Sequence, residues 1–438
     1  GTISASTQLT ALVVDQTTLE LFSIWWGAPA ENSVKALPAE DLLDYAWKHP
    51  GVRAILPFAD LEPRWKVLQV DGISPIAAAF DATDYGLSLP ISLLSEDSEL
   101  LAAFTTLYGP NSSSPLLPTD NIDSSKLTSV VMTGVTALVR ATAWEMDRKG
   151  ITFPAEHVGE LLRSADITHI SNEVPFVADC PKPDPKQTAL TFCSNPDYMQ
   201  LLEVIGTDVV ELTGDHFGDW GAAGMLYTHE LYDSYELPYY GGGENIEQAR
   251  AALTLEHNGN RFAFIGCNAK GGGYATADEN WPGAAECDFP WLEKEIARLQ
   301  KQGYLVIVTF QHFEYYTYEP EPDQIADFRR VADAGAIIVS GSQAHQAQGI
   351  EFRGQALVMY GLGNLFFDQL GVSEDTAQAL IARHIFYDSR HISTELITII
   401  FETYSQPRFM NAQERLILLL KVFEGSGWQQ IENKPSGG

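Results

Sequence analysis

Polar residues that could carry out chemistry recur just after strand-like runs in this sequence. Five such runs are followed within a few positions by Glu173, by Asp215 and His216, by His312, by Gln343 and His345, and by Asn364. Because open α/β sheets bind ligands at the carboxyl ends of their strands, we expect these side chains to gather at one edge. Carboxylate, imidazole and amide groups suit a divalent transition metal that keeps one position open for water.

The chemistry that this set implies is metal-assisted hydrolysis. A bound divalent metal lowers the pKa of water and stabilises negative charge on oxygen, while a nearby histidine moves a proton. Each residue alone also has a structural explanation: His312 or His345 as a hydrogen-bonded loop histidine, Glu173 as an exposed loop carboxylate, Asp215 and His216 as a turn between glycines, and Asn364 as a residue in left-handed backbone. Their joint placement after successive strands favours the functional interpretation.

Strand and helix patterns alternate over the part of the chain that carries these residues. Amphipathic helices are expected at 291–302 and 323–334, each followed by a glycine that suits a helix C-terminus. Apolar runs typical of strands span 129–132, 167–170, 208–212, 261–266, 305–310, 336–340 and 356–360, and a further strand at 393–404 precedes a helix at 411–423. This alternation predicts an α/β domain with a largely parallel or mixed sheet.

The first part of the chain is expected to form a separate unit. Residues 109–126 contain three Pro and five Ser with almost no apolar periodicity, which is typical of a linker. We therefore expect a small α/β N-terminal domain at 1–108, a Pro/Ser-rich linker at 109–126 and the main domain at 127–438. Within the first domain, strand-like runs lie at 54–58 and 66–70, and a helical pattern lies at 38–49.

Charge and hydropathy limit the classes of partner and location. The 438 residues include 58 Asp and Glu against 27 Lys and Arg, a net charge of −31, which argues against nucleic acid because phosphates would be repelled. No apolar run reaches the roughly 18 residues that a membrane helix needs. The start Gly1-Thr-Ile-Ser-Ala-Ser resembles an expression scar, so we expect that an export signal or lipid anchor has been trimmed.

The four cysteines fall into two neighbouring pairs. Cys180 and Cys193 bracket one Pro-rich segment, and Cys267 and Cys287 bracket one Gly-rich segment. We interpret them as two local disulfides formed in an oxidising compartment. The alternative is four buried free thiols.

At these same residues the sequence resembles the CapA family of poly-γ-glutamate capsule synthesis proteins, whose domain is similar to calcineurin-like metallophosphatases. The resemblance covers roughly residues 127–425. Residues 341–351 (GSQAHQAQGIE) resemble the family pattern G-x-H-P-H-x-x-Q-x-x-E, and residues 360–369 (YGLGNLFFDQ) resemble Y-S-L-G-N-x-x-F-D-Q. Residues 171–175 resemble N-L-E-x-P, residues 214–221 resemble N-H-x-x-D-x-G, and residues 312–313 resemble H-W.

The resemblance implies a metallophosphatase-like two-sheet sandwich flanked by helices, with a metal site between strand ends. It implies metal ligands at Glu173, Asp215, His312, Gln343 and His345, and catalytic roles for His216 and Asp219. We take Arg140, Asn172, Glu314 and Asn364 as candidate substrate-binding residues.

Two departures from the family pattern weaken the expected metal centre. Val135 stands where the family has an acidic ligand, and Gln343 stands at the first histidine of H-P-H. Valine cannot coordinate a metal, and glutamine offers only a neutral oxygen. We therefore expect one divalent ion (Mn, Zn, Fe or Ca) rather than two, or none.

The resemblance implies an extracellular or cell-envelope protein that acts in the synthesis, export or processing of poly-γ-glutamate. Metal-dependent hydrolysis is the expected activity, and the expected partners are the anionic polymer and membrane proteins of capsule synthesis. The alternative is a non-catalytic polymer-binding or assembly protein with a degenerate metal site, which Val135 and Gln343 favour. Because the chain is itself acidic, handling of the polymer should depend strongly on salt and divalent ions.

Overall fold

The computed structural model describes residues 11–49, 51–109, 112–113, 120–270 and 273–428. The described chain divides into two compact units, one up to Leu127 and one from Thr128 onward. The expected linker at 109–126 falls in part on residues 110–111 and 114–119, and the expected expression scar falls on residues 1–6. Both of these stretches lie outside the described residues.

The first unit is built around a small parallel sheet. Its strand order is β2 (Val34–Ala36), β1 (Ala11–Val14), β3 (Val52–Ala54). Its helices are α1 (Gln16–Trp26), α2 (Leu42–Lys48) and α3 (Ser98–Tyr108). The helix expected at 38–49 is confirmed as α2, but the strand expected at 66–70 is wrong. Val70 pairs only with Ile73, three residues along, so this apolar run folds as an irregular loop.

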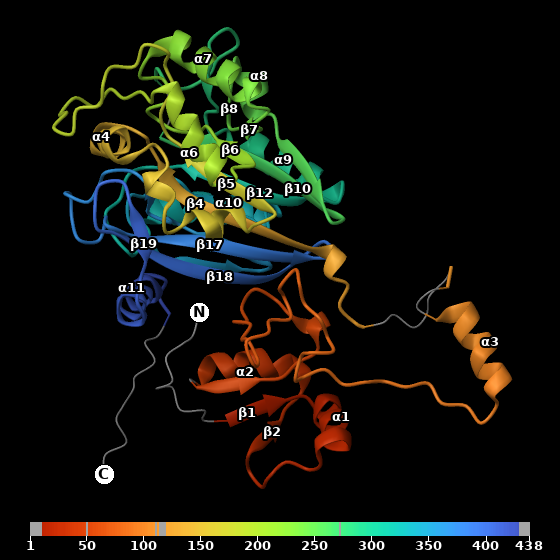
Figure 1. Ribbon diagram of the computed structural model, residues 1–438. Helices are drawn as coiled ribbons and strands as arrows, with labels where there is room; N and C mark the ends of the chain where they lie inside the picture. The colour runs from red at the N-terminus through yellow and green to blue at the C-terminus, as the bar shows by residue number, and fades with distance from the viewer. Residues whose placement is uncertain (1–10, 50, 110–111, 114–119, 271–272, 429–438) are drawn as a thin grey trace, which may run out of the picture. The chain divides into compact units, whose positions relative to one another are not determined.

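The second unit contains two mixed sheets (Figure 1). Among the described residues, the eight-stranded sheet runs β19 (Pro407–Phe409), β18 (Arg390–Phe401), β17 (Gln378–Tyr387), β4 (Leu127–Thr136), β5 (Ile167–Asn172), β6 (Val209–Glu211), β7 (Tyr239–Tyr240), with β16 (Asn364–Phe366) also paired to β4. The six-stranded sheet runs β14 (Ile350–Arg353), β15 (Ala356–Met359), β13 (Ile338–Gly341), β12 (Leu305–Gln311), β10 (Asn260–Asn268), β9 (Leu253–His257). Two short strands, β8 (Gly242–Gly243) and β11 (Gly283–Ala284), form a separate antiparallel pair.

Parallel pairing places several strand ends at the same edge of each sheet. Strands β4, β5, β6 and β7 are joined by parallel ladders, and so are β10, β12, β13 and β15. Antiparallel strands lie at the margins: β9 and β14 in one sheet, and β17 to β19 in the other. The expected mixed α/β topology is therefore confirmed.

Alternating side chains build three apolar layers. One core lies between the sheets and contains Val130 of β4 together with Phe264 of β10 and Ile307 of β12. A second core covers the outer face of the larger sheet, and a third covers the outer face of the smaller one. The helices over the larger sheet are α4 (Arg140–Lys149), α5 (Gly159–Arg163), α6 (Met199–Val204) and α7 (Gly221–Ser234); those over the smaller sheet are α8 (Ile246–Arg250), α9 (Phe289–Lys301) and α10 (Pro322–Ala334).

The expected two-sheet sandwich flanked by helices is confirmed by this layering. The helices expected at 291–302 and 323–334 are α9 and α10, and the expected C-terminal helix is α11 (Ala412–Gly425), which starts with a capping box at Asn411. Both expected disulfides, Cys180–Cys193 and Cys267–Cys287, are formed, so the alternative of four free thiols is wrong. Among the described helices, none has the length and apolar character needed to cross a membrane.

Candidate functional site

Strand β5 delivers a buried carboxylate to the edge of the sandwich. Ile167 packs between the sheets, whereas Ile170 faces the helices over the larger sheet. Because side chains alternate along a strand, Glu173 continues on the face of Ile167 and Asn172 on the face of Ile170. Accordingly Asn172 Nδ2 donates to the hydroxyl of Tyr232 on α7 at 2.9 Å. The structure therefore places Asn172 in the helix layer and does not bring it to the site.

The loop that follows β6 is in backbone contact with Glu173. A Cβ at Gly214 would lie 2.4 Å from the Glu173 carbonyl oxygen, so only glycine fits at this position. The next two residues of the loop are Asp215 and His216. Glu173, Asp215 and His216 each offer a potential ligand atom, and these atoms all lie within 4.8 Å of one another. This group could hold a metal ion.

Glu173 is the most deeply buried member of the group, with 2% of its surface exposed. Its Oε1 accepts a long hydrogen bond of 3.4 Å from Gln311 Nε2, and its Oε2 is buried with no hydrogen-bond partner. Burial, aided by the charge of Asp215, raises the pKa of Glu173 to about 8. A buried carboxylate oxygen without a partner is costly, and a cation would remove that cost.

His216 is held in place by Asp219. Its Nδ1 lies 2.9 Å from Asp219 Oδ2, and that oxygen also accepts a hydrogen bond from the backbone N–H of Phe192 at 2.6 Å. Asp219 Oδ1 accepts a third hydrogen bond, from the Tyr274 hydroxyl at 2.9 Å. Burial opposes the charged form of His216, but the Asp219 hydrogen bond and the nearby carboxylates raise its pKa to about 9. The charged, protonated form of His216 is therefore favoured, and its ring is oriented by the contact with Asp219.

The carboxylate of Asp215 accepts hydrogen bonds from two side chains that the sequence motifs did not single out. Lys270 Nζ forms an ion pair with Oδ2, and Gln311 Nε2 donates to Oδ1 at 3.0 Å. Burial works against ionisation of Asp215, yet the charges of His216 and Lys270 hold its pKa below the usual range. Lys270 lies two residues after the end of β10 and precedes a Gly-rich run, and that position is its only signal in the sequence.

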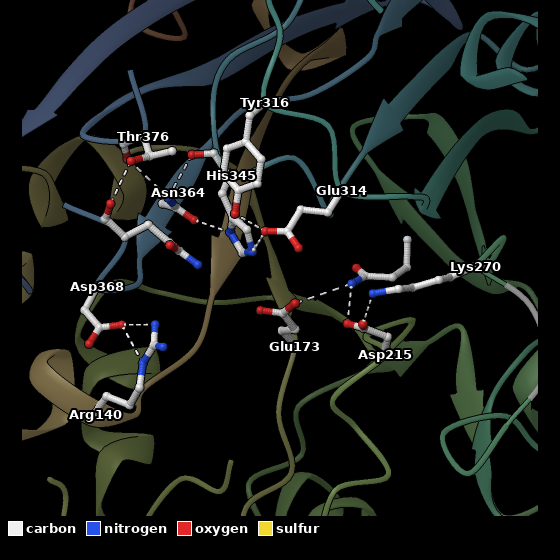
Figure 2. Close-up of polar contacts among 12 residues, drawn as sticks. Arg140, Glu173, Asp215, Lys270, Glu314, Tyr316, His345, Asn364, Asp368 and Thr376 are labelled. Atoms are coloured by element: carbon white, nitrogen blue, oxygen red, sulfur yellow. Dashed lines mark hydrogen bonds and ion pairs between the residues drawn. The ribbon is translucent and has the colours of Figure 1, made fainter. Parts of the chain in front are cut away.

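A second polar cluster lies on the other side of Glu173. His345 Nδ1 is 2.9 Å from Asn364 Oδ1, and His345 Nε2 is 3.5 Å from Glu314 Oε1, which also accepts from the Tyr316 hydroxyl. Burial lowers the pKa of His345. Figure 2 shows Glu173 between the His345–Glu314 pair and the Asp215–Lys270 pair. Of the expected residues, the structure thus gathers Glu314, His345 and Asn364 beside the group that could hold a metal ion.

His312 occupies the opposite face of β12 from the site. Phe310, one residue before Gln311, belongs to the core under α9 and α10, and His312 continues on that face. His312 Nε2 lies 3.2 Å from Asp327 Oδ2 of α10, and its ring packs against Phe328. The structure therefore brings Gln311, and not His312, to Glu173 and Asp215.

The remaining expected residues have other surroundings. Arg140 donates from Nε to Asp368 Oδ1 at 3.0 Å, and its guanidinium lies about 5 Å from the ring centroids of Phe192 and Phe367. Gln343 is 3% exposed, and its Oε1 is buried without a hydrogen-bond partner. Arg140 thus flanks the group from the side of Phe192, and Gln343 offers a free buried oxygen.

Val135 lies in an apolar cluster where the family pattern has an acidic ligand. The cluster contains Val135, Ala137, Val139, Val174, Phe192 and Phe367. A carboxylate at this position would be buried among apolar side chains. Within the described part of the chain, the group that could hold a metal ion is Glu173, Asp215 and His216, and it includes the unpartnered Glu173 oxygen.

The fold and the site together define a class of protein. Its members are α/β sandwiches that carry a group of carboxylate and histidine side chains at their strand ends. The family model described as "Bacterial capsule synthesis protein PGA_cap" matches residues 129–369, more than half of the chain. The chain belongs to this family, and the expected family resemblance is confirmed.

Two curated relatives carry capsule-related names. The capsule biosynthesis protein CapA of Bacillus anthracis is 28% identical over 273 residues, which cover 61% of this chain and 66% of that protein. The PGA biosynthesis protein CapA of Bacillus subtilis (strain 168) is 25% identical over 288 residues, covering 64% of this chain and 73% of that protein. The matched region thus spans just under two thirds of the first relative's length.

Two solved structures show weaker likenesses. The NAD nucleotidase NadN of Haemophilus influenzae has a TM-score of 0.40 at 10% identity, covering 67% of this chain and 55% of that chain. The 5'-nucleotidase precursor of Thermus thermophilus has a TM-score of 0.39 at 11% identity, covering 68% of this chain and 58% of that chain.

Proposed function

We propose that this protein acts in the formation or processing of a poly-γ-glutamate capsule polymer and hydrolyses a bond in it with one divalent cation. The names of the curated relatives, which refer to capsule and PGA biosynthesis, support the choice of this polymer as the substrate. The observation that carries the hydrolytic role is the buried, unpartnered Oε2 of Glu173 beside Asp215 and a histidine that is protonated at neutral pH. A metal ion, carboxylates and a proton donor together are one arrangement that can hydrolyse an amide.

Glu173 and Asp215 would hold the cation. When bound, a divalent ion lowers the pKa of water and stabilises the negative charge that develops on oxygen. His216, with Nδ1 engaged by Asp219, would give a proton from Nε2 to the leaving nitrogen. His345, Glu314 and Asn364 line the other side of Glu173 and would orient the substrate.

The substrate must reach this site against the charge of the protein. The net charge of −31 repels a polyanion at long range, and the basic groups Arg140 and Lys270 are each already paired with an aspartate. Two formed disulfides support an oxidising location, outside the cell or in its envelope, where a capsule polymer is found. In that location the protein would work beside membrane proteins of capsule synthesis.

A second candidate function is non-catalytic binding or assembly of the polymer. The apolar cluster around Val135 favours it, because this cluster replaces an acidic ligand of the family pattern. The Lys270–Asp215 ion pair favours it as well, because an ammonium group already neutralises one of the carboxylates.

Incubation of the full chain with poly-γ-glutamate and added Mn²⁺, Zn²⁺ or Ca²⁺ separates the two functions. We expect new terminal amines to appear with the wild type and to be lost with Glu173→Gln and with His216→Ala. His157→Ala, a change of an exposed histidine, is the matched control and should retain activity. No cleavage by the wild type with any of the three ions would overturn the hydrolytic role, and retained polymer binding would then support the second function.

A further inference from the structure

The ammonium group of Lys270 lies among the carboxylates of the candidate site. It forms a direct ion pair with Asp215, and the charges of Glu314 and Glu173 also act on it. The side chains of Lys270 and Asp215 are 36% and 17% exposed, so the pair is partly shielded from water. A partly shielded ion pair is screened less than one on the surface, and its effect on a neighbouring charge is correspondingly larger.

The backbone around Lys270 is fixed by contacts that connect it to the loop of Asp215. Lys270 N–H donates to Asn268 Oδ1 at 3.0 Å, and Asn268 Nδ2 donates to the carbonyl of Thr213 at 3.0 Å. Cys267, which precedes Asn268, is joined to Cys287 by a disulfide. The lysine and the aspartate are therefore brought together by buried structure, and their pairing is not a chance meeting of two surface side chains.

The same segment is also connected to the strand that carries Gln311. Ala269 N–H donates to the carbonyl of Gln311 at 2.8 Å. Gln311 in turn donates from its side chain to Asp215 Oδ1, while Lys270 holds Oδ2. Both oxygens of Asp215 thus have a protein donor, whereas Oε2 of Glu173, on the adjoining strand end, has none.

We propose that Lys270 is a resident cation of this site: its ammonium group takes the place of one divalent ion and competes with metal for Asp215. This inference rests on the proposed metal site. For Asp215 to coordinate a metal, Lys270 must move away from Oδ2, and the ammonium would still repel a doubly charged ion from close range. Lys270 therefore weakens metal binding, and the single ion that fits is drawn to the Glu173 side of the group.

Competition between an ammonium group and a metal ion can be measured by metal binding, with no assay of enzymatic activity. The probe is Mn²⁺, titrated into the chelator-treated full chain while the electron paramagnetic resonance signal of free Mn²⁺ is followed. Lys270→Met keeps the apolar stem and removes the charge, Lys270→Arg keeps the charge, and Lys301→Met removes an exposed charge at the end of α9. Thermal unfolding of each variant with and without Mn²⁺ gives a second readout of binding and shows that the variant is folded.

We expect Lys270→Met to bind one Mn²⁺ at least tenfold more tightly than the wild type and to gain more thermal stability from the ion. Lys270→Arg and Lys301→Met should bind as the wild type does. Equal or weaker binding by Lys270→Met, including a failure of both proteins to bind, would overturn this inference. A variant that binds Mn²⁺ more tightly while neither protein cleaves the polymer would leave this inference standing and count against the proposed hydrolysis alone.

Discussion

Asp219 Oδ2 lies 2.9 Å from Nδ1 of His216 and fixes which nitrogen of that ring can deliver a proton. The same oxygen accepts the backbone N–H of Phe192, so the position of Asp219 is itself set by the loop before Cys193. The other ring nitrogen, Nε2, is not engaged by Asp219. The His216 ring lies in one group with the carboxylates of Glu173 and Asp215. A charged acceptor behind the histidine also favours its protonated form.

Asp219→Asn should therefore lower the pKa of His216 from its value of about 9, since the charged acceptor is lost while the side-chain shape is kept. If His216 is the proton donor, hydrolysis of the polymer should fall about 100-fold. Titration of the His216 ring protons by NMR measures the pKa directly. Asp179→Asn, a change of an exposed carboxylate, is the control. An unchanged pKa in Asp219→Asn would show that Asp219 does not tune this histidine.

The Cys180–Cys193 disulfide should stabilise the His216 segment through Phe192. The Phe192 ring centroid lies 4.7 Å from that of His216, and its N–H bonds to Asp219. Replacing both cysteines by serine should lower the free energy of unfolding by about 3 kcal/mol, as is typical of a loop of this length. Hydrogen exchange should also become faster at residues 216–220.

The second disulfide provides the matched comparison for that measurement. Replacing Cys267 and Cys287 by serine should speed exchange around Asn268 and Lys270 more than around His216. Equal effects of the two double variants on residues 216–220 would contradict a specific link between Cys193 and the histidine.

Buried neutral histidines should make the protein sensitive to acid. Burial lowers the pKa of His391 to about 3, against about 6.5 when the chain is unfolded, so the folded state binds fewer protons. Its contribution to stability is therefore fully present above about pH 6.5 and is lost as the pH falls from 6.5 towards 3. At pH 4.5 this single group costs about 3 kcal/mol of unfolding free energy.

His391→Gln should reduce the loss of thermal stability between pH 7 and pH 4.5, because glutamine can still bond to Thr394 but does not titrate. Differential scanning calorimetry at the two pH values measures this difference. His157→Gln, at an exposed histidine, should leave the pH dependence as it is in the wild type. Parallel pH profiles for His391→Gln and the wild type would contradict the buried, neutral state of His391.

The sequence allowed the sheets and the gathering of several polar side chains at strand ends to be predicted, because strong apolar runs mark the strands and polar residues mark their ends. It could not show which of the two adjacent residues at the end of β12, Gln311 or His312, faces Glu173. The run Leu305–Phe310 is buried on both faces, so it has no polar alternation from which to read its orientation. His312 was therefore expected at the site and Gln311 was not.

Lys270 could not be predicted for a different reason. Its partner Asp215 is 55 residues away in the chain, and only the assembled sandwich brings the ends of β6 and β10 together. The strand expected at 66–70 failed because an apolar run forms a strand only where a neighbouring strand completes its hydrogen bonds. In each case the missing information was a long-range contact.

The two faces of β12 provide the sharpest test of the site. Gln311→His would place an imidazole nitrogen where an amide N–H now points at Glu173 and Asp215, so Zn²⁺ affinity should rise about tenfold. His312→Gln should leave Zn²⁺ affinity unchanged, because that side chain faces Asp327 of α10, and should cost only about 1 kcal/mol of stability. Competition with a colorimetric zinc chelator measures both affinities. If His312→Gln abolished zinc binding while Gln311→His had no effect, the metal would lie on the other face of β12, and the group around Glu173 would not be its site.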